Sequence, residues 1–175
     1  MSSILFRTAT LEPGSGRTIY GRVVPYGETI SVDDGYGEYR ERFAPGAFRR
    51  SLTERGHKVR LFIGHDTRRL PIGKATSLRD EGDGVHAEFL VADTAAGNEA
   101  LELVRSGVAD SFSVGFRGMR DHRDNGVTVR DEAALLEVSL VGVAAYSGAE
   151  VAGVRSQSLV IPRSIAEARL SPLDW

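Results

Sequence analysis

The sequence predicts an α+β domain rich in β-structure, built as a closed or nearly closed, mainly antiparallel β-barrel with helices packed outside. Many short segments alternate between apolar and polar residues, tight turns separate them, and only two segments carry a helical apolar stripe. A chain of 175 residues has room for one such domain with its own core. We therefore expect one domain over residues 1–155, followed by a C-terminal tail or docked arm over 156–175.

The first part of the chain predicts strands and one short helix. Residues 3–10 and 17–26 carry β-branched and aromatic residues on either side of a Pro-Gly turn, so an antiparallel pair is expected. The acidic segment 33–37 is expected to be a loop, and the alternating EYRERF at 38–43 a strand. A helix is expected over about 46–55, because a proline precedes it and a glycine follows it.

The middle of the chain predicts a strand, a hairpin and a second helix. Residues 58–66 alternate in polarity and end at a Gly-His-Asp sequence. Residues 72–91 form two alternating segments joined by DEGDG, which is typical of a hairpin. Asp93 or Thr94 can cap a helix that ends at Gly107 and carries apolar residues at helical spacing.

Three more strands are expected after that helix. ADSFSVGF at 109–116 has an apolar face and a second face of small residues, the latter being Ser111, Ser113 and Gly115. An Asn-Gly turn then precedes a strand at 134–143. In that strand an apolar face is expected from Leu136, Val138 and Leu140, with Glu137 and Ser139 on the other side. A short strand, AEVAGV at 149–154, is expected to close the domain.

The amino-acid composition excludes several classes of function. The absence of cysteine excludes thiol nucleophiles, thiolate zinc sites and iron-sulfur clusters. A net charge of −2 gives no general attraction to nucleic acid or to an anionic membrane, and no apolar run is long enough to span a bilayer. The N-terminus lacks the pattern of a signal peptide, so a cytoplasmic setting is expected.

Among the four histidines, His65 is the best candidate for a general base. It sits at the end of an apolar strand beside a glycine, which would let it project into a cleft. His57 and His122 are expected to be solvated, and His86 to pack within a strand. Glu137 could orient an imidazole, or could simply face solvent or pair with an arginine.

Either serine of the small polar face could be a nucleophile. Serine needs an adjacent base that a third group orients, and Ser111 and Ser113 share one face. The alternative is that small residues here allow close packing, and Gly115 fits both interpretations. His65 and Asp66 could also be metal ligands, but nothing near them in the sequence completes a coordination set, so neither a metal nor a cofactor is expected.

The chain resembles a known family through several motifs that recur in the family's order. These are FAPGAFRRSL, VRLFIGHDTRRLPIGKATSLRDEGDGVHAEF, TAAGNEALELVRSGVADSFSVGF and LLEVSLVGVAAYSGAEV, and the resemblance as a whole runs from about residue 17 to 154. They resemble the prohead maturation proteases of HK97-type tailed bacteriophages and prophages. The resemblance implies a serine endopeptidase with a fold similar to that of the herpesvirus assembly proteases, a β-barrel ringed by helices, over residues 1–155.

The resemblance also implies a catalytic set. His65 of GHD would be the general base and Ser113 of SVGF the nucleophile, because the family's serine is followed by any residue and then Gly-Phe or Gly-Tyr. Glu137 would be the third member, where the herpesvirus enzymes use a second histidine. Ser111, Gly115 and Gly142 would line the substrate site, with backbone N–H groups of the loop at 142–148 as the oxyanion donors.

The implied substrates are the scaffold-like segment of the phage major capsid protein and the protease itself. Cleavage would take place inside the assembling procapsid, in the cytoplasm of the bacterial host, and dimerisation is plausible by analogy with the herpesvirus enzymes. The tail after residue 155 could be self-processed or could target the capsid. A second hypothesis is a non-enzymatic β-barrel module that binds a capsid or scaffold strand by strand addition.

Overall fold

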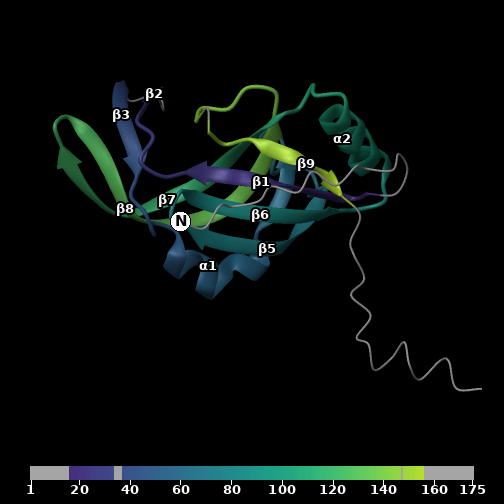
Figure 1. Cartoon of the computed structure of the whole chain (residues 1–175), viewed down its shortest axis with the longest axis horizontal. Helices are drawn as coiled ribbons and strands as arrows, with labels where there is room; N and C mark the ends of the chain where they lie inside the picture. Colours follow the sequence, from purple (N-terminus) through teal and green to yellow (C-terminus); the bar gives the residue numbers. More distant parts are fainter. Residues whose placement is uncertain (1–15, 34–36, 147, 156–175) are drawn as a thin grey trace, which may run out of the picture.

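The computed structural model describes residues 16–33, 37–146 and 148–155. Within these ranges the chain forms one large sheet with two α-helices and a 3₁₀ turn (Figure 1). The strands are β1 (Thr18–Pro25), β2 (Ile30–Asp33), β3 (Glu38–Phe43), β4 (Arg60–Ile63), β5 (Gly73–Glu81), β6 (Gly84–Val91), β7 (Ser111–Asp124), β8 (Val127–Val141) and β9 (Val151–Arg155). The helical segments are α1 (Arg49–Arg55), η1 (Gly56–Lys58) and α2 (Ala95–Arg105).

The strand order is β2-β3-β8-β4-β5-β6-β1-β9, and β7 pairs with β8 as well. The sheet is mixed, because β8 runs parallel to both β3 and β4, while the other ladders are antiparallel. The prediction of a mainly antiparallel, β-rich α+β fold is therefore confirmed. Both parallel neighbours lie beside the long β8, which reaches across the molecule and contacts three strands.

The prediction of a closed or nearly closed barrel needs correction, because the described strands form a sheet that is not closed into a barrel by continuous ladders. One isolated bridge, between Ser111 and Glu150, connects the beginning of β7 with the segment before β9. Two backbone hydrogen bonds lie beside it, from Phe112 N to Ala149 O and from Val151 N to Asp110 O. This contact is an isolated bridge and not a ladder, so it does not close the sheet into a barrel.

The two helices pack on different sides of the strands (Figure 1). α1 and the turn before it dock on β8 through hydrogen bonds: Ala133 N donates to the carbonyl of Ala47 in the turn, and Leu135 N donates to the buried Ser51 hydroxyl of α1. Thr94 is the N-cap of α2, because its side chain accepts a hydrogen bond from Gly97 N, so of the two predicted caps, Asp93 and Thr94, the second is confirmed. Within the described ranges, neither helix has the length and apolar character that a membrane span requires.

The core has an aromatic centre between α1, β3 and β7. Phe43 contacts Phe48, Phe116 and Tyr146, with ring centroids 5.0, 4.9 and 5.4 Å away. A second aromatic pair, Phe89 and Phe112, joins β6 to β7 with centroids 6.0 Å apart. These contacts, with the aliphatic residues around them, hold β7 and β8 against the rest of the sheet.

Most element predictions agree with the structure. The strand expected over 3–10 lies outside the described residues and stays a prediction. Two differences occur among the described residues. The four-residue strand β2 was not predicted, and β7 and β8 extend far beyond 109–116 and 134–143 as a two-stranded arm. The Asn-Gly turn at the tip of this arm is correct, because Asn125 and Gly126 both have positive φ, at 49° and 78°.

Candidate active site

His65 follows the end of β4 in a strained turn. The strand ends at Ile63, and Gly64 and His65 both have left-handed backbone conformations, with φ of 57° and 60°. A non-glycine residue in this region costs of the order of 1 kcal/mol or more, and such strain is concentrated at functional sites. Gly64 N donates to Leu140 O, which fixes the turn against β8. The His65 side chain remains 43% exposed and is therefore accessible from solvent.

Glu137 of β8 holds the His65 ring. Its Oε1 lies 2.6 Å from His65 Nδ1, and its side chain is only 10% exposed. Because a carboxylate only accepts hydrogen bonds, Nδ1 is the donor, and Nε2 is the nitrogen left to accept a proton. A buried carboxylate beside an imidazole also stabilises the imidazolium ion that forms when the ring takes up a proton.

Ser139 completes this arrangement, and the sequence analysis gave it no role. Its side chain is fully buried, its hydroxyl donates to Glu137 Oε2 at 2.9 Å, and it accepts a hydrogen bond from His65 N at 3.0 Å. Both oxygens of Glu137 are thus fixed, and the backbone of His65 is tied to the same strand. The alternation of β8 did place Ser139 on the face of Glu137, but its bonding to two partners depends on the pairing of β4 with β8.

Ser113 lies on the same face of the sheet. In the antiparallel β7–β8 ladder, Ser113 is directly opposite Ser139, and Gly115 is opposite Glu137. Side chains directly opposite each other share a face, with Cβ atoms roughly 5 Å apart. Among the described residues, no hydrogen bond joins the Ser113 hydroxyl to the His65 ring. The structure therefore brings Glu137 and His65 into contact, and it places Ser113 on the same face, opposite the Ser139 that bonds to both of them.

Ser111 is farther along the same face, opposite Val141. Its hydroxyl donates to the neighbouring Asp110 carboxylate at 2.7 Å. The Ser111 hydroxyl therefore donates its proton to Asp110 and not to a residue of the His65–Glu137 pair.

Gly115 lies against the side chain of Glu137. A Cβ atom at this position would lie 2.5 Å from Glu137 Oε1 and 3.0 Å from Glu137 Cγ. The space left by the missing side chain is therefore occupied by Glu137, which gives a structural reason for a glycine here. The expected place of Gly115 in the substrate site stays a prediction.

A β-bulge at Leu136 sets which residues of β8 face the site. The register passes from Gly115–Glu137 to Phe116–Leu135, which leaves Leu136 without an opposite residue, and it is 45% exposed. The prediction that Leu136 shares an apolar face with Val138 is therefore wrong, because Leu135 takes the core position. Bulges commonly re-aim side chains next to active sites.

The loop after β8 is anchored by buried polar contacts. Tyr146 donates to Oε1 of the buried Glu41 at 3.0 Å, and burial, together with the Glu41 charge, raises the pKa of Tyr146 well above its usual value. The other oxygen of Glu41 pairs with Arg130 at 2.9 Å. Gly148 N donates to Glu28 Oε2, so this N–H is not free to serve as an oxyanion donor.

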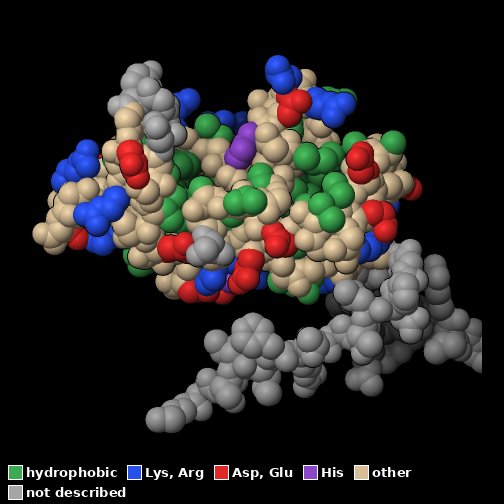
Figure 2. Space-filling view, turned by 90° about the horizontal axis from the view of Figure 1, so that it is seen from above, with side chains coloured by type: hydrophobic (Ala, Val, Ile, Leu, Met, Phe, Trp, Pro, Cys, Tyr) green, Lys and Arg blue, Asp and Glu red, His purple; other side chains and the backbone are tan. Residues whose placement is uncertain are grey.

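An apolar groove of about 410 Å³ lies beside the His65 turn. It runs between the ends of β4 and β8, helix α2 and the segment that follows α2, and every residue along it is aliphatic or glycine. Gly142, which was expected to line the substrate site, is one of the residues along this groove. Figure 2 shows hydrophobic side chains gathered near a histidine on the face in view.

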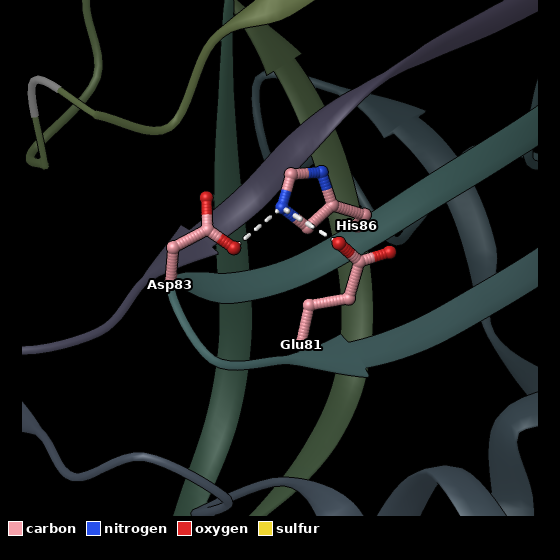
Figure 3. Close-up of side chains that lie close together, drawn as sticks. All are labelled: Glu81, Asp83 and His86. Atoms are coloured by element: carbon pink, nitrogen blue, oxygen red, sulfur yellow. Dashed lines mark hydrogen bonds and ion pairs between the residues drawn. The ribbon is translucent and has the colours of Figure 1, made fainter. Parts of the chain in front are cut away.

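The rival metal site would have used His65 and Asp66. In the structure His65 Nδ1 contacts Glu137, whereas Asp66 pairs with Arg68 at 3.1 Å. A group able to hold a cation does occur elsewhere in the described chain, on the β5–β6 hairpin (Figure 3). It comprises Glu81, Asp83 and His86.

Arginines already neutralise the hairpin cluster. Arg79 Nε contacts Glu81 Oε1 at 2.9 Å, and Arg22 Nη1 contacts Asp83 Oδ2 at 3.0 Å. His86 Nε2 lies 3.0 Å from Asp83 Oδ1, and this hydrogen bond is the main reason why the pKa of Asp83 is lowered. The ion pairs account for the clustering of these residues without a cation.

Comparisons with known proteins agree with the motifs. A family model described as caudovirus prohead serine protease matches residues 7–162. The prohead protease of Enterobacteria phage HK97 is 29% identical over 116 residues, which are 64% of this chain and 52% of the phage protein. This chain therefore spans about half the length of that relative. Among solved structures, the bacteriophage T4 capsid assembly protease, gp21, matches with a TM-score of 0.47 and 10% identity, over 73% of this chain and 99% of that chain.

Proposed function

This chain belongs to the family of caudovirus prohead serine proteases, and from that premise we propose that it is a serine endopeptidase with the triad Ser113, His65 and Glu137. The observation that carries the proposal is the 2.6 Å contact between His65 Nδ1 and Glu137 Oε1, made on the sheet face that also carries Ser113. A serine needs an adjacent base that a third group orients, and His65 and Glu137 supply the base and the group that orients it. Serine–histidine distances are often longer in a free enzyme than in the substrate complex.

The proposed reaction is acyl transfer in two halves. His65 Nε2 takes the proton of Ser113 as its Oγ bonds to the peptide carbonyl carbon, and the same proton passes to the amine nitrogen as the C–N bond breaks. A water molecule then attacks the acyl ester while His65 accepts a proton from the water. That proton returns to Ser113 when the ester C–O bond breaks. Glu137 keeps the ring in one tautomer and stabilises its cation throughout.

The oxyanion of each tetrahedral intermediate needs backbone donors near Ser113. We assign them to N–H groups of the Gly142–Gly148 loop other than that of Gly148, which is bonded to Glu28. The buried bond between Tyr146 and Glu41 supports this assignment, because it holds the loop in place. A donor of this type contributes about 3–4 kcal/mol to the stabilisation of a transition state.

The family also indicates substrates and a setting. The proposed substrates are the scaffold-like segment of the phage major capsid protein and this chain itself, cleaved inside the assembling procapsid in the host cytoplasm. Confinement there would raise the effective concentration of substrate and time the cleavage. The domain is proposed to comprise residues 1–155, and residues 156–175 to be a self-processed or capsid-targeting tail. Mass spectrometry of the protein in assembled proheads tests this, since an intact C-terminus would refute self-processing there.

The endopeptidase is tested by labelling and by cleavage. The full chain should react with a fluorophosphonate probe at Ser113, and co-expression with the major capsid protein of the same phage should shorten the capsid chain. Ser113→Ala should lower both by about 10⁴-fold or more, whereas the matched control Ser111→Ala should retain both. Chelators should have no effect.

Two results would overturn the proposal. Capsid binding without labelling or cleavage would favour the strand-binding module. Labelling that persists unchanged in Ser113→Ala would refute the assignment of the nucleophile.

A further inference from the structure

The apolar groove is continuous with the face that carries the proposed triad. On β8, Glu137, Ser139 and Val141 alternate along this face, and Val141 lines the groove. Two residues of a strand span about 7 Å, so the groove begins about that distance from Ser139, the residue opposite Ser113. On the other side Gly64, which also lines the groove, directly precedes His65.

The walls of the groove have one chemical character. No charged or hydrogen-bonding side chain lines it within the described residues, and its volume of about 410 Å³ is in the range of ligand pockets. Three of its residues are strongly exposed for apolar side chains, with exposed fractions of 41% for Ile63, 62% for Val108 and 88% for Val143. A charged side chain entering this space would lose its hydration without a partner, whereas an aliphatic one would lose only unfavourable contact with water.

We propose that this groove is a specificity subsite, which binds an aliphatic side chain of the polypeptide substrate within about two residues of the scissile bond. The proposal rests on the endopeptidase activity proposed above and adds the chemistry of the residue that is recognised. The occupant is assigned from the position of the groove, because a peptide in extended form across Ser113 has a side chain about every 3.3 Å. A side chain one or two residues from the cleaved bond therefore falls at the entrance near Val141.

The test is a cleavage profile of the full chain on a library of peptides of defined sequence, read by mass spectrometry. Wild-type protein should show enrichment of leucine, isoleucine, valine or methionine at one position within two residues of the cut. Exchange of that residue for alanine or aspartate should lower kcat/KM roughly 10- to 200-fold.

The groove is altered by Val108→Lys, a change at an exposed position that leaves the core intact. This variant should lose the aliphatic preference and gain a preference for aspartate or glutamate at the same position. The matched control is Met119→Lys, which places the same charge on the exposed part of the β7–β8 arm, where Met119 is 58% exposed, and should keep the wild-type profile.

Labelling separates failure of the subsite from failure of the activity. Labelling by the small fluorophosphonate is measured on the wild type and on Met119→Lys, whose substitution lies outside the groove, and both should be labelled at the same rate. A profile without aliphatic enrichment, or one unchanged by Val108→Lys, from a protein that is labelled and cleaves peptides would overturn the subsite alone. Absence of both labelling and cleavage in the wild type would overturn the endopeptidase and the subsite with it.

Discussion

The substitution Gly115→Ala should disable the site although it replaces no residue of the proposed triad. The new Cβ would lie 2.5 Å from Glu137 Oε1, whereas ordinary contact begins at 3.4 Å, so the carboxylate must retreat by 3.4 − 2.5, or about 0.9 Å. If the retreat is directed away from His65, the distance from Oε1 to Nδ1 grows from 2.6 Å to about 3.5 Å, the limit of a hydrogen bond. The ring then loses its fixed tautomer and orientation.

The size of the effect follows from this displacement. A misplacement of about 1 Å in a catalytic group can cost about 10²-fold in rate, and the loss of a triad carboxylate's function costs about 10⁴-fold. We therefore expect kcat to fall by about 10²- to 10⁴-fold, with KM nearly unchanged. The overpacking should also destabilise the fold by about 1–3 kcal/mol.

The assay is the rate of fluorophosphonate labelling, followed by peptide cleavage once a substrate sequence is known. Thermal denaturation would verify that the variant is folded, and proton NMR would report the His65 Nδ1–H resonance, which should shift or broaden when Glu137 moves. The matched control is Gly82→Ala, at a position where an added Cβ meets nothing within 4 Å. A folded Gly115→Ala protein that reacts within a few-fold of the wild-type rate would refute the reasoning.

Two further substitutions test the contacts around the site. Ser139→Ala removes the hydrogen-bond partner of Glu137 Oε2 and of His65 N. Leaving these buried polar groups unpaired should lower the free energy of unfolding by about 1–3 kcal/mol and should slow fluorophosphonate labelling. An equal labelling rate in this variant and the wild type would contradict a positioning role for Ser139. Tyr146→Phe tests the loop anchor through pH. Because burial raises the pKa of Tyr146 in the folded state, its contribution to stability is full below about pH 10 and is lost at higher pH, so urea unfolding at increasing pH should show a smaller alkaline loss for the variant; identical profiles would contradict the buried bond.

Local signals in the sequence were sufficient to predict most of the helices and strands. Thr94 and Gly107 bracket α2, and the two alternating segments around residue 82 form the β5–β6 hairpin, because these signals act within a few residues. The short β2 carries too few residues for a period to be visible. The arm of β7 and β8 escaped prediction since it is exposed along β7 from Arg117 to Arg123, where no apolar face marks a strand.

The site could be predicted only in part, because its geometry depends on pairing between distant strands. The motifs indicated His65, Ser113 and Glu137. The alternation of residues placed Ser113 on the polar face of its strand and Glu137 on the polar face of another. Neither signal contains the parallel pairing of β4 with β8, which brings the His65 backbone to Ser139. The contact of Gly115 with Glu137 could not be predicted either, because Glu137 is 22 residues away in the sequence and lies opposite Gly115 only in the folded ladder.

The bulge at Leu136 is what allows one strand to serve both the core and the site. Before the bulge, Ala133 and Leu135 face the core, so an uninterrupted strand would turn residues 137 and 139 to the core as well. The extra residue reverses the alternation, which sends Val138 and Leu140 inward and Glu137 and Ser139 to the site.

The bulge has a fixed position because its neighbours are tied to other elements. The buried Ser51 hydroxyl of α1 accepts the hydrogen bond of Leu135 N, directly before the bulge. On the far side, Leu140 O accepts the hydrogen bond of Gly64 N. A slip of β8 by one residue would therefore break both contacts and bury the Glu137 carboxylate in the core, where its charge would have no partner. The placement of the proposed catalytic carboxylate is thus set by the same contacts that hold α1 and the His65 turn on the sheet.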